Sequence, residues 1–179
     1  SRPGHRSIDQ TLNKCLCFDL MRQNKLHGAI CYNDAKSCYN RIVHSVASSM
    51  AMKRQGVPEE ATIAMFSTIQ QLQHHISTVY GCSSFTFSND TNIPTHRVCQ
   101  GNGAGPAIWA VVSTSIINTL RAAGFGFKLH TSILNQEIHI VSFGYVDDFG
   151  LIQTAETTEL AVTQLQNALS LWENSLHTT

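Results

Sequence analysis

The sequence predicts an α+β domain in which helices and strands do not alternate regularly. Several stretches space their apolar residues at helical intervals and carry capping residues, whereas shorter apolar runs are rich in strand formers and bounded by turn residues. At least five helices and about six strands are expected from these patterns. The strand patterns cluster in residues 75–99 and 125–153 instead of following each helix, which favours α+β over a doubly wound sheet. A chain of 179 residues is long enough to bury a core without disulfides.

The first elements are a helix over roughly 8–24 and a strand over 29–32. Ser7 and Gln10 form a capping-box pattern that predicts the start of the helix. The predicted strand is apolar, and Asp34 lies at its end. The helix is predicted from apolar residues at helical spacing, namely Ile8, Leu12, Cys15, Leu16 and Leu20.

Four more helices are expected further along. One covers about 42–54, and another opens at Pro58, because proline and acidic residues suit the first turn of a helix. A strongly apolar helix over 107–123 ends at Gly124. The last helix is amphipathic, with one face formed by Leu160, Leu165, Leu169, Trp172 and Leu176.

Between these helices the sequence predicts strands and one glycine-rich loop. Residues 76–80 and 84–87 read as short strands, and 125–153 as hairpins. Residues 100–106, Gln-Gly-Asn-Gly-Ala-Gly-Pro, form the loop, whose glycines permit a ligand to approach the backbone closely. It is neither a Walker loop nor a dinucleotide fingerprint, because the lysine and the preceding strand are missing.

The net charge of the chain is zero, but its two ends carry opposite charges. Zero charge alone argues against a nucleic-acid-binding protein. Residues 1–54 carry nine bases and three acids, however, whereas residues 129–179 carry six acids and no Lys or Arg. Such a chain can bind an anion at one end and cations at the other. Chance scatter of the charges is the alternative interpretation.

Composition also bounds the cellular setting. No apolar run approaches the length of a membrane helix, and no secretory signal opens the chain. The six cysteines form no C-x-x-C pair, which argues against structural zinc and favours reduced thiols in an intracellular protein, nuclear or cytoplasmic. Because the chain begins without Met, we expect it to be part of a longer protein.

Two short apolar segments end or begin at acidic residues. Asp147 and Asp148 lie between aromatic and apolar flanks, where a doubled acid is costly unless a cation compensates it. Asp34 ends another apolar strand, and pairing of the two strands would bring Asp34 and Asp147 together. Such carboxylates suit a pair of divalent ions that assist phosphoryl transfer. A solvated turn at the doublet and a helix N-cap at Asp34 are the structural alternatives.

Together these segments resemble the palm motifs of reverse transcriptases. Asp34, followed five residues on by an aromatic, resembles motif A. Gln-Gly-x-x-x-Gly-Pro-Ala-Ile-Trp at 100–109 resembles motif B, and Tyr-Val-Asp-Asp at 145–148 resembles motif C, so the motifs occur in the family's order. Residues 2–7, Arg-Pro-Gly-His-Arg-Ser, also resemble a segment of non-LTR retrotransposon and group II intron enzymes. The resemblance covers nearly the whole chain.

The resemblance implies a role for each matching residue. Asp34 and Asp147 would be metal ligands, Asp148 the third acid of the site, and the Ala35 carbonyl could complete one ion's shell. The residues that would contact substrate are Tyr39 as the steric gate against a 2′-hydroxyl, Gln100 and Gly101 along the nascent base pair and template, and Tyr145 near the primer end.

The implied activity is RNA-directed DNA synthesis, in which two Mg²⁺ or Mn²⁺ ions assist addition of a dNTP to the 3′-hydroxyl of a DNA primer on an RNA template. Residues 1–179 would then be a single right-hand polymerase palm, an antiparallel sheet backed by helices, with part of the fingers. The upstream fingers, the thumb and the rest of a retrotransposon polyprotein would lie outside it, so the fragment alone is expected to be weak or inactive.

Three other interpretations remain. A degenerate or domesticated reverse-transcriptase-like domain would only bind nucleic acid or a partner. An RNA-dependent RNA polymerase shares the palm, but its usual Gly-Asp-Asp and polar ribose-selecting residue are not seen here. An unrelated structural domain would require all three motifs to be coincidence.

Overall fold

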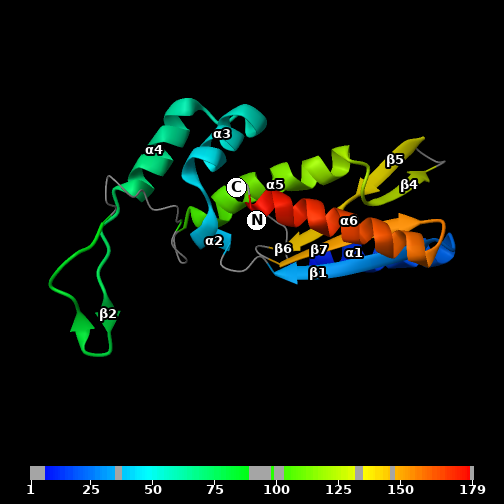
Figure 1. Ribbon diagram of the computed structural model, residues 1–179, viewed down its shortest axis with the longest axis horizontal. Coiled ribbons are helices and arrows are strands. Elements are labelled where there is room, and N and C mark those ends of the chain that lie inside the picture. Colours follow the sequence, from blue (N-terminus) through cyan, green and yellow to red (C-terminus); the bar gives the residue numbers. More distant parts are fainter. Residues whose placement is uncertain are drawn as a thin grey trace. The chain divides into compact units, whose positions relative to one another are not determined.

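The chain forms a mixed α/β structure with small antiparallel sheets, as seen in a computed structural model (Figure 1). The structure describes residues 7–34, 38–88, 98, 103–131, 135–145 and 148–177. It divides into two compact units. The first contains residues 1–38 and 113–178, and the second contains residues 39–112. The prediction of mixed helices and antiparallel strands is confirmed at this level, and the polymerase palm stays a prediction.

The first unit is built around a three-stranded antiparallel sheet in the order β1-β7-β6. Its central strand, β7, pairs with β1 over eight residue pairs and with β6 over four. Helix α1 precedes the sheet in sequence and helix α6 follows it. The bounds are α1 Ser7–Gln23, β1 His27–Asp34, β6 Ser142–Tyr145, β7 Asp148–Ala155 and α6 Thr158–His177.

The two faces of this sheet pack against different helices. Successive side chains of a strand point to opposite faces, so Phe149 lies on one face and Ile152 on the other. The Phe149 ring meets Trp172 of α6 at a centroid distance of 5.1 Å. Ile152 belongs to a buried cluster with Cys17 of α1 and Phe143 of β6. The sheet is therefore covered by α6 on one side and by α1 on the other.

A second ribbon, β4 (Phe127–Thr131) with β5 (Gln136–Ile140), extends this core. Phe127 is fully buried in the cluster that packs under α1. Gln153, buried in β7, accepts a 2.7 Å hydrogen bond from the Gly126 amide and donates one of 2.7 Å to Gln164 of α6. A buried amide with its hydrogen bonds satisfied fixes how these elements join.

The second unit is mostly helical and carries a short hairpin. His44, buried at the start of α3, packs against the Phe66 ring of α4 at a centroid distance of 5.3 Å. Beyond α4, two strands of two residues each form the hairpin. The bounds are α2 Cys38–Arg41, α3 His44–Gln55, α4 Glu59–Gln70, β2 Ser77–Thr78 and β3 Gly81–Cys82, with α5, Gly105–Ala122, divided between the units.

The five predicted helices are confirmed to within a few residues, and two other expectations need correction. The apolar stripe that predicts α1 is not its packed face, because Ile8, Leu12 and Leu16 are at least half exposed whereas Cys17 is buried. The strands expected over 76–80 and 84–87 shrink to the short hairpin and one bridge between His74 and Phe87. Their residues are exposed, since no described element covers them as a helix covers the sheet of the first unit.

Two features bear on the setting of the protein. Among the described residues, no helix is long and apolar enough to span a membrane. The cysteines among the described residues are free thiols, and burial raises the pKa of Cys17 above its usual value.

Candidate functional site

The sheet of the first unit sets two of the predicted acids side by side. Asp34 is the last residue of β1 and Asp148 the first of β7, and the two are direct partners in the antiparallel register. Directly opposed residues in such a ladder have Cα atoms about 4.5–5.5 Å apart, and their side chains share one face of the sheet. The predicted pairing of the two acid-bearing strands is therefore observed, with Asp148 as the residue opposite Asp34.

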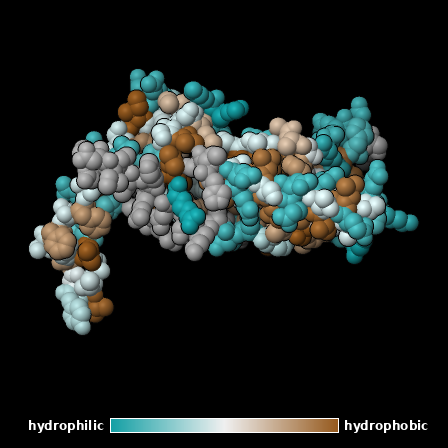
Figure 2. All heavy atoms as spheres, viewed as in Figure 1, coloured by the Kyte–Doolittle hydropathy of each residue, from teal (hydrophilic) through white to brown (hydrophobic). Residues whose placement is uncertain are grey.

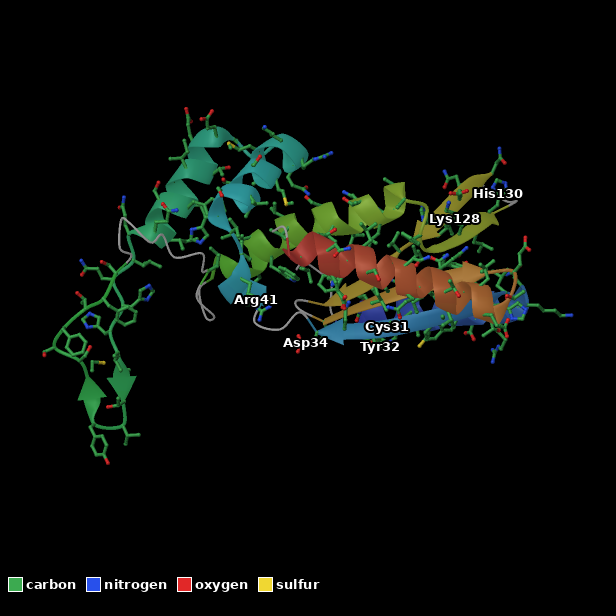
Figure 3. All side chains as sticks on the ribbon, in the orientation of Figure 1. Cys31, Tyr32, Asp34, Arg41, Lys128 and His130 are labelled. Carbon is green, nitrogen blue, oxygen red and sulfur yellow. The ribbon has the colours of Figure 1, made fainter. Side chains whose placement is uncertain are left out.

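The strands end where they do for local reasons. The run from Ala29 to Cys31 is apolar and packs within the sheet, while Asp34 is exposed at its end (Figure 3). In β7 the buried run starts at Phe149, one residue after Asp148. Each strand thus carries its acid at the point where burial stops, so both carboxylates remain open to solvent and available to a ligand.

The acid pair lines a pocket of about 430 Å³ in the first unit. Four elements contribute to its walls. Helix α1 supplies two polar side chains, and the strands supply the acids, aromatic rings and a glycine. The lining residues are Gln10, Lys14, Tyr32, Asn33, Asp34, Phe143, Asp148, Phe149 and Gly150.

Asp34 and Asp148 make no salt bridge with any described residue. Like charges directly opposed across a ladder repel each other. Among the described residues the ion pair within 4 Å is Arg22 with Asp19, on α1, and neither Asp34 nor Asp148 has such a partner. The pair is therefore suited to a cation, and oxygen donors of this kind are those that Mg²⁺ and Mn²⁺ prefer.

One base lies in the same pocket, held by an aromatic ring. The ammonium nitrogen of Lys14 is 4.9 Å from the centroid of the Tyr32 ring, a cation–π geometry. Tyr32 in turn lies against Gly150, its partner in the ladder, where an added Cβ would come within 3.1 Å of the ring. The glycine therefore gives the ring room to lie along the sheet beside the acids.

In the second unit, the predicted gate residue meets the glycine-rich segment. The ring of Tyr39 lies against Gly105 at the start of α5, where an added Cβ would be 3.3 Å from the ring. The Tyr39 carbonyl accepts a 2.9 Å hydrogen bond from the amide of Val98. Motif-A and motif-B residues of the resemblance are thus neighbours within this unit.

Several predicted site residues cannot be placed. Ala35, Gln100, Gly101 and Asp147 lie outside the described residues, as does the side chain of Tyr145, although the Tyr145 backbone pairs with Asp148. Within the described part of the chain, no group of three or more His, Cys, Asp or Glu side chains is arranged to hold a metal ion. Of the three predicted metal ligands, Asp34 and Asp148 are therefore brought together by the described residues, and the metal site itself stays a prediction.

Sequence reasoning missed part of the pocket. Tyr32 could have been found, because it lies two residues before Asp34 and strand alternation puts both on one face. Lys14 and Gln10 gave no such signal, since only the packing of α1 on the sheet decides which side of that helix borders the acids.

The chain matches no model of a known protein family, and no curated protein is significantly similar to it.

Proposed function

We propose that this chain is the catalytic core of an RNA-directed DNA polymerase that adds dNTPs to a primer 3′-hydroxyl. The observation that carries the proposal is the cross-strand pair of Asp34 and Asp148, which opens onto a pocket large enough for part of a nucleotide. The glycine-rich and Tyr-Val-Asp-Asp segments, which follow Asp34 in the order of reverse transcriptase motifs, support the choice of this reaction class.

In this proposal the acids hold two Mg²⁺ or Mn²⁺ ions. Asp34 and Asp148 would bind them together with Asp147 and the Ala35 carbonyl. Bound divalent ions supply activation of the attacking hydroxyl and neutralisation of charge on the phosphoryl oxygens. The chain's own contribution is to hold the carboxylates close together at the end of a paired ladder, so that little reorganisation is needed.

Substrate selection falls to residues outside the acid pair. Tyr39, packed on Gly105, would lie under the sugar and exclude a 2′-hydroxyl, which favours dNTP over rNTP. Gln100 and Gly101 would line the template side, and Tyr145 the primer end. The positive N-terminal third suits template and triphosphate, whereas the negative C-terminal third contains two of the three acids. The retroelement polyprotein that would carry this core is part of the same proposal.

Primer extension by the full-length natural protein tests the activity. An RNA template with a DNA primer and dNTPs is compared with a DNA template and with rNTPs, in Mg²⁺, in Mn²⁺ and in EDTA. Asp34→Asn and Asp148→Asn remove a charge with little change of volume, and Glu137→Gln, an exposed carboxylate on β5, is the matched control. We expect each Asp variant to lose about 10³-fold or more of kcat/KM and the control to keep it.

Metal affinity gives a second measurement that does not depend on turnover. Binding of Mn²⁺, followed by the loss of its free-ion electron paramagnetic resonance signal, should weaken in both Asp variants and not in Glu137→Gln. Extension that persists in the double variant Asp34→Asn, Asp148→Asn would contradict the proposal. A wild-type protein that binds primer–template without extending it would favour the degenerate, nucleic-acid-binding alternative.

A further inference from the structure

We propose that Lys14, held over the ring of Tyr32, is a phosphate-binding residue of the candidate site. This inference rests on the proposed function and adds to it the group that receives the anionic part of the substrate. It assigns Lys14 and Tyr32 to the site, although no motif of the sequence singles them out. The phosphate could belong to the polynucleotide strand or to the nucleotide, and the experiment below separates these two sources.

The pocket is the first support, because it brings opposite charges to one place. Lys14 from α1 and the acids Asp34 and Asp148 line the same 430 Å³ space, yet among the described residues Lys14 makes no ion pair with either acid. A lysine drawn to the carboxylates would neutralise them and compete with a metal ion. Lys14 instead places a positive charge in the pocket of the carboxylates without pairing with either of them.

The second support is the contact between Lys14 and the Tyr32 ring. Its ammonium is 4.9 Å from the Tyr32 ring centroid, and its side chain is only partly exposed. Tyr32 is 60% exposed, so its ring is accessible to a ligand, and it lies over Gly150. A lysine that already lies over a ring has less conformational entropy to lose when it binds an anion than a freely rotating lysine has.

The third support is the spacing along the strand. Tyr32 and Asp34 are two residues apart on one face of β1, which corresponds to about 6.6 Å along the strand. The phosphate that would contact Lys14 is therefore either the one held by cations at the acid pair or the next phosphate of the same substrate. A cation subsite next to an anion subsite is the arrangement that a metal–phosphate substrate requires.

Binding measurements on the full-length protein test the proposal without turnover. Calcium replaces magnesium so that binding proceeds without chemistry. One arm measures affinity from the fluorescence anisotropy of a fluorescein-labelled DNA primer on an RNA template. It is repeated between 50 and 300 mM KCl, a range that brackets the ionic strength at which cells screen charges. The other arm follows binding of a fluorescent dATP analogue. The variants are Lys14→Met, Lys14→Gln and Lys14→Arg, and Lys128→Met is the matched control, since Lys128 is an exposed base of the same unit at the opposite end from Asp34 (Figure 3).

The expected result is a loss of affinity with the signature of a lost phosphate contact. Lys14→Met and Lys14→Gln should lower the affinity measured in one of the two arms about tenfold, and Lys14→Arg should bind nearly as well as wild type. If the polynucleotide is the source, the slope of log affinity against log salt should also fall by roughly 0.7–0.9, which a purely structural effect would not produce. If the nucleotide is the source, the dATP arm alone should weaken.

Two outcomes overturn the inference. One is that both neutral Lys14 variants, folded by circular dichroism, bind as Lys128→Met does in both arms. The other is that affinity falls with an unchanged salt slope and without an effect on dATP. The proposed function fails separately, if the wild-type protein binds both ligands but extends no primer. In that case a Lys14 effect on binding still supports the phosphate site.

Discussion

The two units of the chain differ in how long their antiparallel strands are and in how far other elements cover them. In the first unit, β1 and β7 pair over eight residues, and helices cover both faces of their sheet. In the second, β2 and β3 pair over two residues, and Val79 and Tyr80 at the turn are fully exposed. Figure 2 shows apolar and polar residues mixed on the surface of that hairpin. The comparison teaches that strand-forming segments extend into a long ladder where another element buries a face of the sheet.

The proposed chemistry is divided along the same line. The acid pair, Lys14 and Tyr32 belong to the first unit, whereas Tyr39 and Gly105 belong to the second. Variants in the first unit should therefore change stability and metal or phosphate binding. Variants in the second should change the choice of nucleotide.

The largest effect is expected from Trp172, the helix residue that covers the sheet. Trp172 is 2% exposed and packs on Phe149, next to Asp148. Trp172→Ala should lower the free energy of unfolding by about 3–5 kcal/mol, because it leaves a large cavity under β7. Urea denaturation followed by circular dichroism measures this change. A loss below 1 kcal/mol would mean that α6 does not support the ladder, and the contrast between the units would fail.

The gate residue should affect selectivity and leave metal binding intact. Tyr39→Ala removes the ring that packs on Gly105. We expect the ratio of kcat/KM for dATP over ATP to fall by about 10–200-fold, the range for a lost steric contact in a pocket. Mn²⁺ affinity should stay unchanged, since the acids belong to the other unit. An unchanged nucleotide ratio would leave Tyr39 as a core aromatic only.

A smaller loss of stability is expected at Gly144 in β6. An added Cβ there would lie 2.7 Å from the Phe149 ring, so the ring must shift. Gly144→Ala should therefore lower the free energy of unfolding by about 1–3 kcal/mol, as overpacking does. Gly103→Ala is the matched control, because its Cβ would meet nothing within 4 Å. Equal melting curves for the two variants would show that this side of β7 tolerates bulk.

The smallest effect belongs to the hairpin. Val79→Ser and Tyr80→Ser replace side chains that contact solvent only, so each should change the free energy of unfolding by no more than about 0.5 kcal/mol. Thermal melts of both variants against wild type measure this. A loss above 1 kcal/mol would reveal packing at the hairpin and would remove the difference between the two pairs of strands.

The sequence by itself determined most helices and the position of the acids. Capping residues, apolar spacing and terminating glycines are local signals, and Gly124 ends α5 with a positive φ of 87° as its position predicts. Asp34 and Asp148 were found because each adjoins an apolar strand, which is also local.

The tertiary structure decided which residues meet at the pocket. The register that sets Asp34 opposite Asp148 joins strands far apart in sequence, and it depends on how β7 packs between α1 and α6. The same packing turned Cys17 of α1 inward, left Leu12 exposed and brought Lys14 to the Tyr32 ring. Local patterns cannot supply this, because the buried side of a helix is chosen by the surface that it covers.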